Sequence, residues 1–245
     1  MDHHVKFLIV SDIHGNREGL EAVLQNARGQ YDRIVCLGDI VGYGADPNFA
    51  VDWARAHVSA IVRGNHDAVC AGLESLSWFN ANAADAAAWS RHALSAKNLA
   101  YLKRLPSGPL PYEGFDLVHG SPCGEYDYLG SRSDVAAISD RLTTPLTFFG
   151  HTHEQGGFEI KPSGKITLIN PHRVLQLAPR SKYLVNPGSV GQPRDRDPDA
   201  AYAIYSPTER RIEFRRVEYD TKAAGNKIVA AGLSPGLASR LLVGA

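Results

Sequence analysis

The order of the apolar segments predicts an α/β fold with a parallel sheet, a second and more antiparallel sheet, and an inserted helical cap. Three observations lead to this prediction. Strand and helix patterns alternate over residues 5–62, an alanine-rich helical pattern covers about 73–105, and strand patterns dominate residues 158–217. The alternation is typical of βαβ units, and the late run of strand patterns is typical of a largely antiparallel sheet.

The first five elements follow one another as strand, helix, strand, helix and strand. Their predicted ranges are 5–10, 16–27, 33–37, 47–56 and 60–62. In the first helix the apolar residues recur at helical spacing, and Pro47 suits the first turn of the second helix. This order predicts a parallel sheet whose strands end on one common edge.

The segment from Leu73 to Leu105 is predicted to form two helices that break near Leu94-Ser95 and end before Pro106. We interpret this segment as a cap inserted after the third strand. Its large apolar side chains are expected to form a small core of the cap and not a platform for stacking bases. They are Trp78, Phe79, Trp89, Leu94, Leu99 and Leu102.

After the cap, strands are predicted at 115–118 and 146–149, with a helix at 134–142 between them. Strand patterns then follow at 158–160, 165–169, 183–185, 201–205 and 211–217. Two short helices are predicted to close the chain, at 223–231 and from Ser234-Pro235 to Leu242. No internal repeat or linker interrupts this order, so we expect residues 1–245 to form a single domain.

Composition narrows the class of protein. The 245 residues are 44% hydrophobic, enough for a substantial core. They carry 26 basic and 26 acidic side chains, so the net charge does not favour binding to extended nucleic acid or to an anionic membrane. The sequence has no apolar run long enough to span a membrane and no signal-peptide pattern. Its three cysteines, Cys36, Cys70 and Cys123, are widely spaced, which favours a reducing, cytoplasmic location.

Several predicted strands end in the same way, with metal-binding side chain types directly after the last apolar residue. These turns are Ser11-Asp12-Ile13-His14, Gly38-Asp39, Gly64-Asn65-His66-Asp67, His119-Gly120 and Gly150-His151-Thr152-His153. Ligands of open α/β sheets bind at the carboxyl ends of the strands, so the five turns are expected to meet in one crevice. In extended backbone, residues i and i+2 face the same way, which would aim Asp12 with His14, and His151 with His153, into it.

Each turn also has an ordinary structural explanation. Asp12 and Asp39 suit helix caps, Asn65 suits a turn, and His119 suits a buried, hydrogen-bonded position. Five such turns at successive strand ends indicate a site, because coincidence explains them poorly. The remaining histidines are expected to be surface or packing residues; they are His3, His4, His57, His92 and His172.

The five turns together resemble the calcineurin-like metallophosphoesterase family, whose pattern is D-x-H, G-D, G-N-H-D/E, H and G-H-x-H. Every element of that pattern is present, and the resemblance runs from about Val5 to Tyr205. The segments 97–102 and 186–195 resemble a small bacterial branch of the family. The resemblance implies a four-layer α/β/β/α sandwich of two mixed sheets, with the helical cap as an insertion.

The resemblance also implies a pair of metal ions. By analogy Asp12, His14 and His153 would bind one metal, Asn65, His119 and His151 the other, and Asp39 would bridge them. Mixed imidazole and carboxylate donors suit Mn, Zn, Fe, Ni or Co better than Ca or Mg. The residues therefore predict two divalent transition-metal ions of unspecified identity.

Two such ions, two carboxylates and a bridging hydroxide leave a net charge of about +1, which favours an anionic phosphoester. Paired metals can lower the pKa of a bridging water and stabilise both oxygens of an in-line displacement. The expected reaction is hydrolysis of small phosphodiesters or phosphomonoesters, a class that includes nucleotides. His66 would protonate the leaving oxygen or bind the phosphoryl group, and Asp67 would fix the tautomer of His66.

Two arginines are candidate substrate ligands. The protein phosphatases and dinucleoside tetraphosphatases of the family have an arginine after the G-D block, which residues 38–44 lack. Arg63 matches another arginine of those enzymes, although it also suits the solvated end of a strand. Arg194 lies in a loop that either reaches the crevice or forms a structural turn. Cys123 lies outside the pattern and is interpreted as incidental.

Three functions are compatible with these residues. A metal-dependent phosphoesterase acting on small substrates explains all five turns, and a cap that walls the crevice disfavours folded protein substrates. A protein or dinucleoside polyphosphate phosphatase is the alternative within enzymes. A non-catalytic scaffold that resembles a retromer subunit is the alternative outside them, and it is disfavoured because the full ligand pattern is present. The sequence specifies neither the substrate, the native metals nor the oligomeric state.

Overall fold

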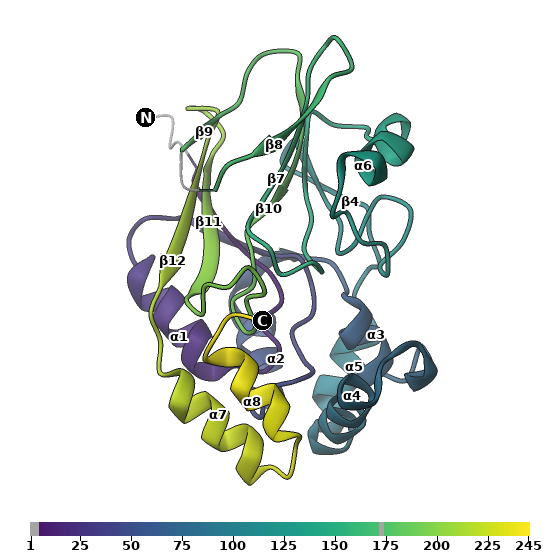
Figure 1. Ribbon diagram of the computed structural model, residues 1–245, viewed down its shortest axis with the longest axis vertical. Coiled ribbons are helices and arrows are strands. Elements are labelled where there is room, and N and C mark those ends of the chain that lie inside the picture. Colours follow the sequence, from purple (N-terminus) through teal and green to yellow (C-terminus); the bar gives the residue numbers. More distant parts are fainter. Residues whose placement is uncertain (1–4, 172–173) are drawn as a thin grey trace.

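The computed structural model describes residues 5–171 and 174–245, which form two six-stranded sheets with helices around them (Figure 1). The predicted alternation at the start of the chain is confirmed. It consists of β1 (Phe7–Val10), α1 (Arg17–Asn26), β2 (Arg33–Cys36), α2 (Pro47–His57) and β3 (Val58–Ile61). The side chain of Asn16 caps α1 by accepting a hydrogen bond from the Gly19 N–H, which explains where that helix begins.

Helix α3 (Asn65–Cys70) follows β3 and leads into the cap. The cap contains two main helices, as predicted: after the 3-10 turn η1 (Leu76–Trp78) come α4 (Ala81–Ala93) and α5 (Ala96–Leu102). The break falls at Leu94 and Ser95, where extended backbone separates the helices and the Ser95 side chain caps α5. Helix α3 was not predicted, because its six residues are too few for a periodic pattern.

The rest of the chain adds mainly strands. The elements are β4 (Leu110–Tyr112), β5 (Phe115–Leu117), α6 (Arg132–Ile138), the 3-10 turn η2 (Ser139–Arg141), β6 (Leu146–Phe148), β7 (Gly156–Ile160), β8 (Ile166–Ile169), β9 (Leu175–Gln176), β10 (Lys182–Asn186), β11 (Ala200–Ser206), β12 (Arg211–Val217), α7 (Thr221–Ala230) and α8 (Pro235–Leu241). Strands β4 and β9 were not predicted; each has only two or three residues.

The strands are divided between the sheets differently from the expectation. One sheet has the order β3-β2-β1-β11-β12-β9 and the other β4-β5-β6-β10-β7-β8. The prediction that the late strands form a second sheet by themselves is therefore wrong for β11 and β12. Strand β11 pairs antiparallel with β1, with Leu8 opposite Ile204. Alternation of apolar residues predicts that a segment is a strand, but it does not specify the partner across such a long sequence separation.

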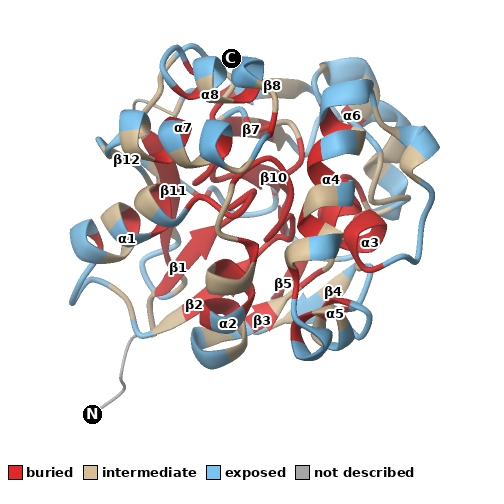
Figure 2. Cartoon of the chain, turned by 90° about the horizontal axis from the view of Figure 1, so that it is seen from below, coloured by how far each residue is buried: buried red, intermediate tan, exposed pale blue. Residues whose placement is uncertain are grey.

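Three apolar cores separate four layers. Phe7 and Val35 of the first sheet pack with Phe115 and Phe148 of the second in the core between the sheets. A second core joins the first sheet to α1, α2 and the cap, and a third lies between the second sheet and α6. Figure 2 shows buried residues on the central strands and exposed ones on the outer faces of the helices. The predicted α/β/β/α sandwich is confirmed.

Within the described part of the chain, no helix is both long and apolar enough to cross a membrane. The three cysteines are unpaired: Cys36 and Cys70 are buried and Cys123 is exposed. His57 and His92 are exposed, as expected. His3, His4 and His172 lie outside the described residues.

Candidate metal centre

The predicted donors meet at the strand ends, and they come from both sheets. Residues that follow β1 and β2 supply Asp12, His14 and Asp39, and α3 begins with Asn65 after β3. From the second sheet, His119 follows β5, and His151 and His153 follow β6. All seven side chains are buried. The structure therefore brings together every residue that the sequence predicts as a metal ligand.

Four of these residues form a first cluster. Asp12, His14, Asp39 and His153 each offer one donor atom, and all four atoms lie within 4.8 Å of one another. The Nε2 atoms of His14 and His153 are 3.1 Å apart. His153 Nε2 is also 3.4 Å from an Asp12 carboxylate oxygen, and His14 Nε2 is 3.6 Å from Asp39 Oδ2.

A second cluster shares Asp39 with the first and adds His119 and His151. His119 Nε2 lies 3.3 Å from Asp39 Oδ2 and 3.0 Å from the amide oxygen of Asn65. This division into two groups around Asp39 is the same as the one that the resemblance implies.

The first cluster contains two lone pairs that face each other. His14 Nδ1 lies 2.9 Å from the Val41 carbonyl and His153 Nδ1 lies 2.6 Å from the Gln192 carbonyl. A carbonyl can only accept a hydrogen bond, so each neutral ring carries its proton on Nδ1 and directs the lone pair of Nε2 at the other ring. A cation between the two rings removes that repulsion, so these residues fit a metal.

The second cluster gathers acceptors in the same way. His119 Nδ1 lies 2.7 Å from the Leu37 carbonyl and donates to it, so Nε2, which faces the oxygens of Asn65 and Asp39, is the nitrogen on which a metal can replace a proton. Asp39 Oδ2 and His151 Nε2 are buried and have no hydrogen-bond partner among the described residues. Buried polar atoms are rarely left unpaired, so these two also point to a bound cation.

The pKa shifts keep two of the imidazoles neutral and show how the Asp39 carboxylate acts on a third. Burial lowers the pKa of His14 to about 4 and that of His151 to about 3, so both rings are neutral and able to bind a metal. Burial also opposes protonation of His119, but the Asp39 carboxylate outweighs it and raises the pKa of His119 to about 10. An added positive charge is therefore strongly favoured beside Asp39.

Backbone strain is concentrated in the same loops. Six of the ten non-glycine residues with positive φ in the described chain lie in them: Asp12, His14, Asp39, Tyr43, His151 and His153. Such conformations are unfavourable for side chains with a Cβ and cluster at functional sites. The expectation that Asp12 with His14, and His151 with His153, lie in extended backbone is thus wrong. Asp12 and His14 nevertheless share one cluster, whereas His151 and His153 lie in different ones.

Two glycines allow the close packing of these loops. A Cβ at Gly64 would lie 2.0 Å from Asp39 Oδ1, and one at Gly150 would lie 2.1 Å from the Ser11 hydroxyl oxygen. Asp39 Oδ1 instead accepts a hydrogen bond of 2.8 Å from the His66 N–H. Glycine at position 64 therefore leaves space for the carboxylate that both clusters share.

His66 lines the crevice in front of the clusters, but its expected partner does not reach it. The Asp67 carboxylate accepts hydrogen bonds from the backbone N–H groups of Ile40, Val41 and Gly64. The prediction that Asp67 fixes the tautomer of His66 is therefore wrong; Asp67 ties α3 to the loop after β2. The Nδ1 of His66 is buried against Gly42 without a hydrogen-bond partner among the described residues, so Nε2 is the nitrogen available to a ligand.

The two predicted arginines have different surroundings. Arg63 forms a bidentate ion pair with Glu125, at 2.5 and 3.2 Å, and lines a neighbouring cavity. The prediction that Arg63 binds substrate phosphate is therefore wrong, because its guanidinium is paired with Glu125 and does not line the crevice. Arg194 lines the crevice, donates to the Tyr43 hydroxyl and to Gln192, and has a buried Nε without a partner. No carboxylate in the described part of the chain pairs with Arg194.

The crevice has a volume of about 370 Å³, within the usual range for small-molecule sites. The cap forms part of its wall, as predicted, but the expected cap core is only partly correct. Leu94 and Leu102 are buried, and Phe79, Trp89 and Leu99 are partly buried against apolar clusters that include residues of the cap. Trp78 is exposed and faces the crevice, which Phe79 also lines. Sequence reasoning also missed Tyr43, whose ring centroid lies 4.7 Å from that of His14 and 4.5 Å from that of His66.

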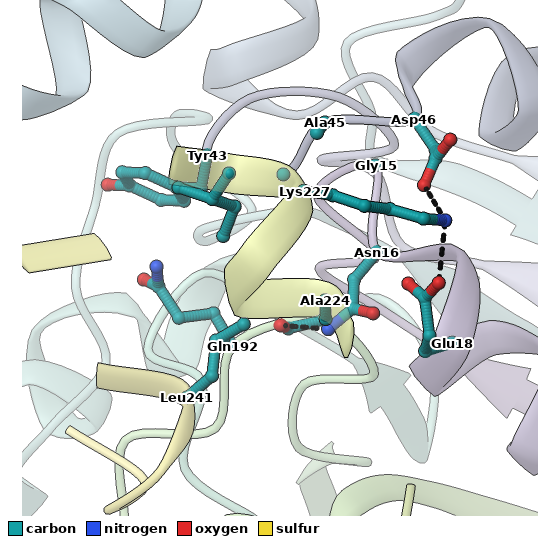
Figure 3. A pocket seen from close by; sticks show the side chains of 13 residues that line it. Gly15, Asn16, Glu18, Tyr43, Ala45, Asp46, Gln192, Ala224, Lys227 and Leu241 are labelled. Carbon is teal, nitrogen blue, oxygen red and sulfur yellow. Dashed lines mark hydrogen bonds and ion pairs between the residues drawn. The ribbon is translucent and has the colours of Figure 1, made fainter. Parts of the chain in front are cut away.

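Side chains of the C-terminal helices meet the loops that follow β1 and β2 (Figure 3). Lys227 of α7 forms ion pairs of 2.6 Å with Glu18 and 2.7 Å with Asp46, at the starts of α1 and α2. The Asn16 side chain donates to the Gly191 carbonyl at 2.9 Å. The cavity between these residues has a volume of only about 10 Å³, so this region serves as support and not as a binding site.

Comparison with known proteins agrees with the fold. The model of the calcineurin-like phosphoesterase superfamily domain matches residues 5–210, so the chain belongs to this family. An uncharacterized protein of Methanocaldococcus jannaschii is 38% identical over 250 residues, which cover 96% of this chain and 97% of that protein. A metallophosphoesterase from Sphaerobacter thermophilus is similar in structure, with a TM-score of 0.87, 39% identity and coverage of 98% of this chain and 99% of that chain.

A hypothetical protein from Pyrococcus horikoshii shares the fold. Its TM-score is 0.78 at 18% identity, with coverage of 98% of this chain and 99% of that chain. The family and the two donor clusters together define a metallophosphoesterase with candidate sites for divalent metal ions.

Proposed function

We propose that this protein is a metal-dependent hydrolase that cleaves small phosphodiesters or phosphomonoesters. One observation carries the proposal: two clusters of buried acceptors share Asp39 and open into one crevice of small-molecule size. Asp12, His14 and His153 would hold one divalent ion, Asn65, His119 and His151 a second, and Asp39 both. Ions bound there would supply positive charge for the phosphoryl oxygens and a water nucleophile of lowered pKa.

Side chains of this protein would bind and orient the substrate. Arg194 is the cation in the crevice without an acidic partner in the described chain, so it is suited to a phosphoryl oxygen. His66 would donate a hydrogen bond from Nε2 to the phosphoryl group or protonate the leaving oxygen. The cap restricts access to the crevice, which favours small substrates over folded proteins. We place the activity in the reducing cytoplasm, away from membranes and extended nucleic acid.

The test is hydrolysis of p-nitrophenyl phosphate and bis-p-nitrophenyl phosphate by protein stripped with a chelator and reloaded with Mn, Zn, Fe, Ni or Co. We expect turnover that needs added metal, and the faster substrate identifies a monoesterase or a diesterase. Asp39→Asn is the control, because it removes the carboxylate that both clusters share, and we expect kcat to fall about 100-fold or more. Unchanged turnover in Asp39→Asn protein of full metal content would exclude this assignment.

A further inference from the structure

The wall of the crevice is unusually aromatic. Five of its thirteen lining residues carry phenyl, phenol or indole rings, whereas these residue types make up only 9% of the chain. They are Tyr43, Trp78, Phe79, Tyr126 and Tyr128. Of the same thirteen residues, only Ala83 has an aliphatic side chain. This composition favours a ligand with a flat ring over one with an aliphatic chain.

Two of these rings are also exposed. Trp78 is 69% exposed and Tyr128 is 57% exposed. Every other Phe, Tyr or Trp in residues 5–171 and 174–245 is buried or partly buried. Both exposed rings line the crevice, so a flat ligand bound there would bury apolar ring surface that the fold leaves open to solvent. Trp78 ends the short turn η1, in which no residue is buried.

The aromatic wall begins beside the metal donors. The ring centroid of Tyr128 lies 4.1 Å from that of His151, in the second cluster. Phe79 stacks on His66 with centroids 4.3 Å apart and planes inclined by 29°. Trp78 and Tyr126 have centroids 5.8 Å apart, which is too close for a third ring to enter between them. A ligand ring would therefore stack on the open face of Trp78.

We propose that this wall is a subsite for the base of a nucleoside phosphoester, which makes nucleotides the substrate class. This inference rests on the proposed function, because the phosphoryl group would lie at the donor clusters and Arg194. Sugar or glycerol phosphates have no flat ring and would gain little from five aromatic side chains. Nucleotides combine an anionic phosphoryl group with a base, and stacking on aromatic side chains tolerates every base.

Two matched substrate pairs test the subsite. The diester pair is p-nitrophenyl thymidine 5′-phosphate and methyl p-nitrophenyl phosphate, which share a leaving group; the monoester pair is AMP and ribose 5-phosphate. We expect kcat/KM to be about tenfold higher for the member with a base. Trp78→Ala should remove most of that ratio, mainly through KM, and Trp78→Phe should restore it. Trp89→Ala, in the same cap but outside the crevice, should keep the wild-type ratio.

Binding is measured separately, so that the subsite is tested even if the protein does not hydrolyse these compounds. We expect AMP to quench tryptophan fluorescence of the zinc-loaded protein, ribose 5-phosphate to leave it unchanged, and Trp78→Phe to abolish the quenching. Quenching without turnover of any pair would support the subsite and contradict the proposed function. Turnover with equal kcat/KM within each pair, or a ratio unaffected by Trp78→Ala, would overturn the subsite and leave the proposed function intact.

Discussion

At the scale of single residues, the two arginines show that partners decide what a side chain can do. Arg63 is neutralised by the Glu125 carboxylate and faces another cavity, whereas the guanidinium of Arg194, among the described residues, donates to the neutral side chains of Tyr43 and Gln192. A guanidinium that is partly buried without a carboxylate keeps its full charge for an anionic ligand. Arg194 is therefore the residue whose loss should most affect substrate binding without disturbing the donor clusters.

Arg194→Gln should lower kcat/KM for the better p-nitrophenyl substrate about 10- to 100-fold, because a hydrogen bond to a charged group contributes roughly 1.5 to 3 kcal/mol. The loss should appear mainly in KM, and the metal content measured by atomic emission should not change. Arg63→Gln is the matched control and should retain turnover within about twofold of wild type. Equal losses in the two variants would contradict a specific role for Arg194.

The clustering of the candidate donors could be predicted at this scale, because each follows an apolar strand and carries a side chain type that binds metals. The hydrogen-bond partners of Asp67 and the exposure of Trp78 could not be predicted. Whether Asp67 bonds to an imidazole or to backbone N–H groups depends on how α3 meets the loop after β2. Whether Trp78 is buried in the cap or faces the crevice depends on packing between segments, which the apolar character of a side chain does not specify.

At the scale of secondary structure elements, the C-terminal helices α7 and α8 support the loops that carry the candidate donors Asp12, His14 and Asp39. Helices α1 and α2 follow the loops that carry Asp12, His14 and Asp39. Lys227 of α7 joins the beginnings of both helices through Glu18 and Asp46. Tyr43, which contacts His14, packs into the same apolar cluster as α7 and α8. These C-terminal helices thus hold the loops in place, although they provide no donor.

Lys227→Met should lower the free energy of unfolding by about 1 kcal/mol, because it leaves two neighbouring carboxylates without their shared cation and the site is partly exposed to solvent. Urea unfolding followed by circular dichroism measures the change. The difference from wild type should shrink in 1 M salt, since screening weakens exposed ion pairs. Lys222→Met on the same helix is the control; an equal loss there would mean that helix propensity, and not the ion pairs, is responsible.

The existence and type of most elements could be predicted, whereas their assignment to sheets could not. The two cap helices and their break at Leu94 and Ser95 follow from local periodicity and capping. The insertion of β11 beside β1 is decided by contacts between the ends of the chain. Local sequence carries no record of such pairing, and short strands such as β9 are defined only by the partner they meet.

At the scale of the whole molecule, each donor cluster joins the two sheets. The first combines Asp12, His14 and Asp39 of the first sheet with His153 of the second. The second combines Asp39 with His119 and His151 of the second sheet. An ion in either cluster would therefore bind across the sandwich and oppose separation of its halves. It would also relieve the repulsion between buried lone pairs that the folded chain brings together.

Metal binding should accordingly raise the thermal stability of the whole fold. With free metal at 100 times its dissociation constant, the folded state gains about 2.7 kcal/mol, which for a chain of this size raises Tm by about 5 to 10 °C. Scanning calorimetry of chelated and reloaded protein measures this shift. Asp39→Asn should lose most of it, because both clusters lose a donor. Lys227→Met should have a lower Tm but keep the shift, since its donors are intact. A shift that survives in Asp39→Asn would place the bound metal outside these clusters.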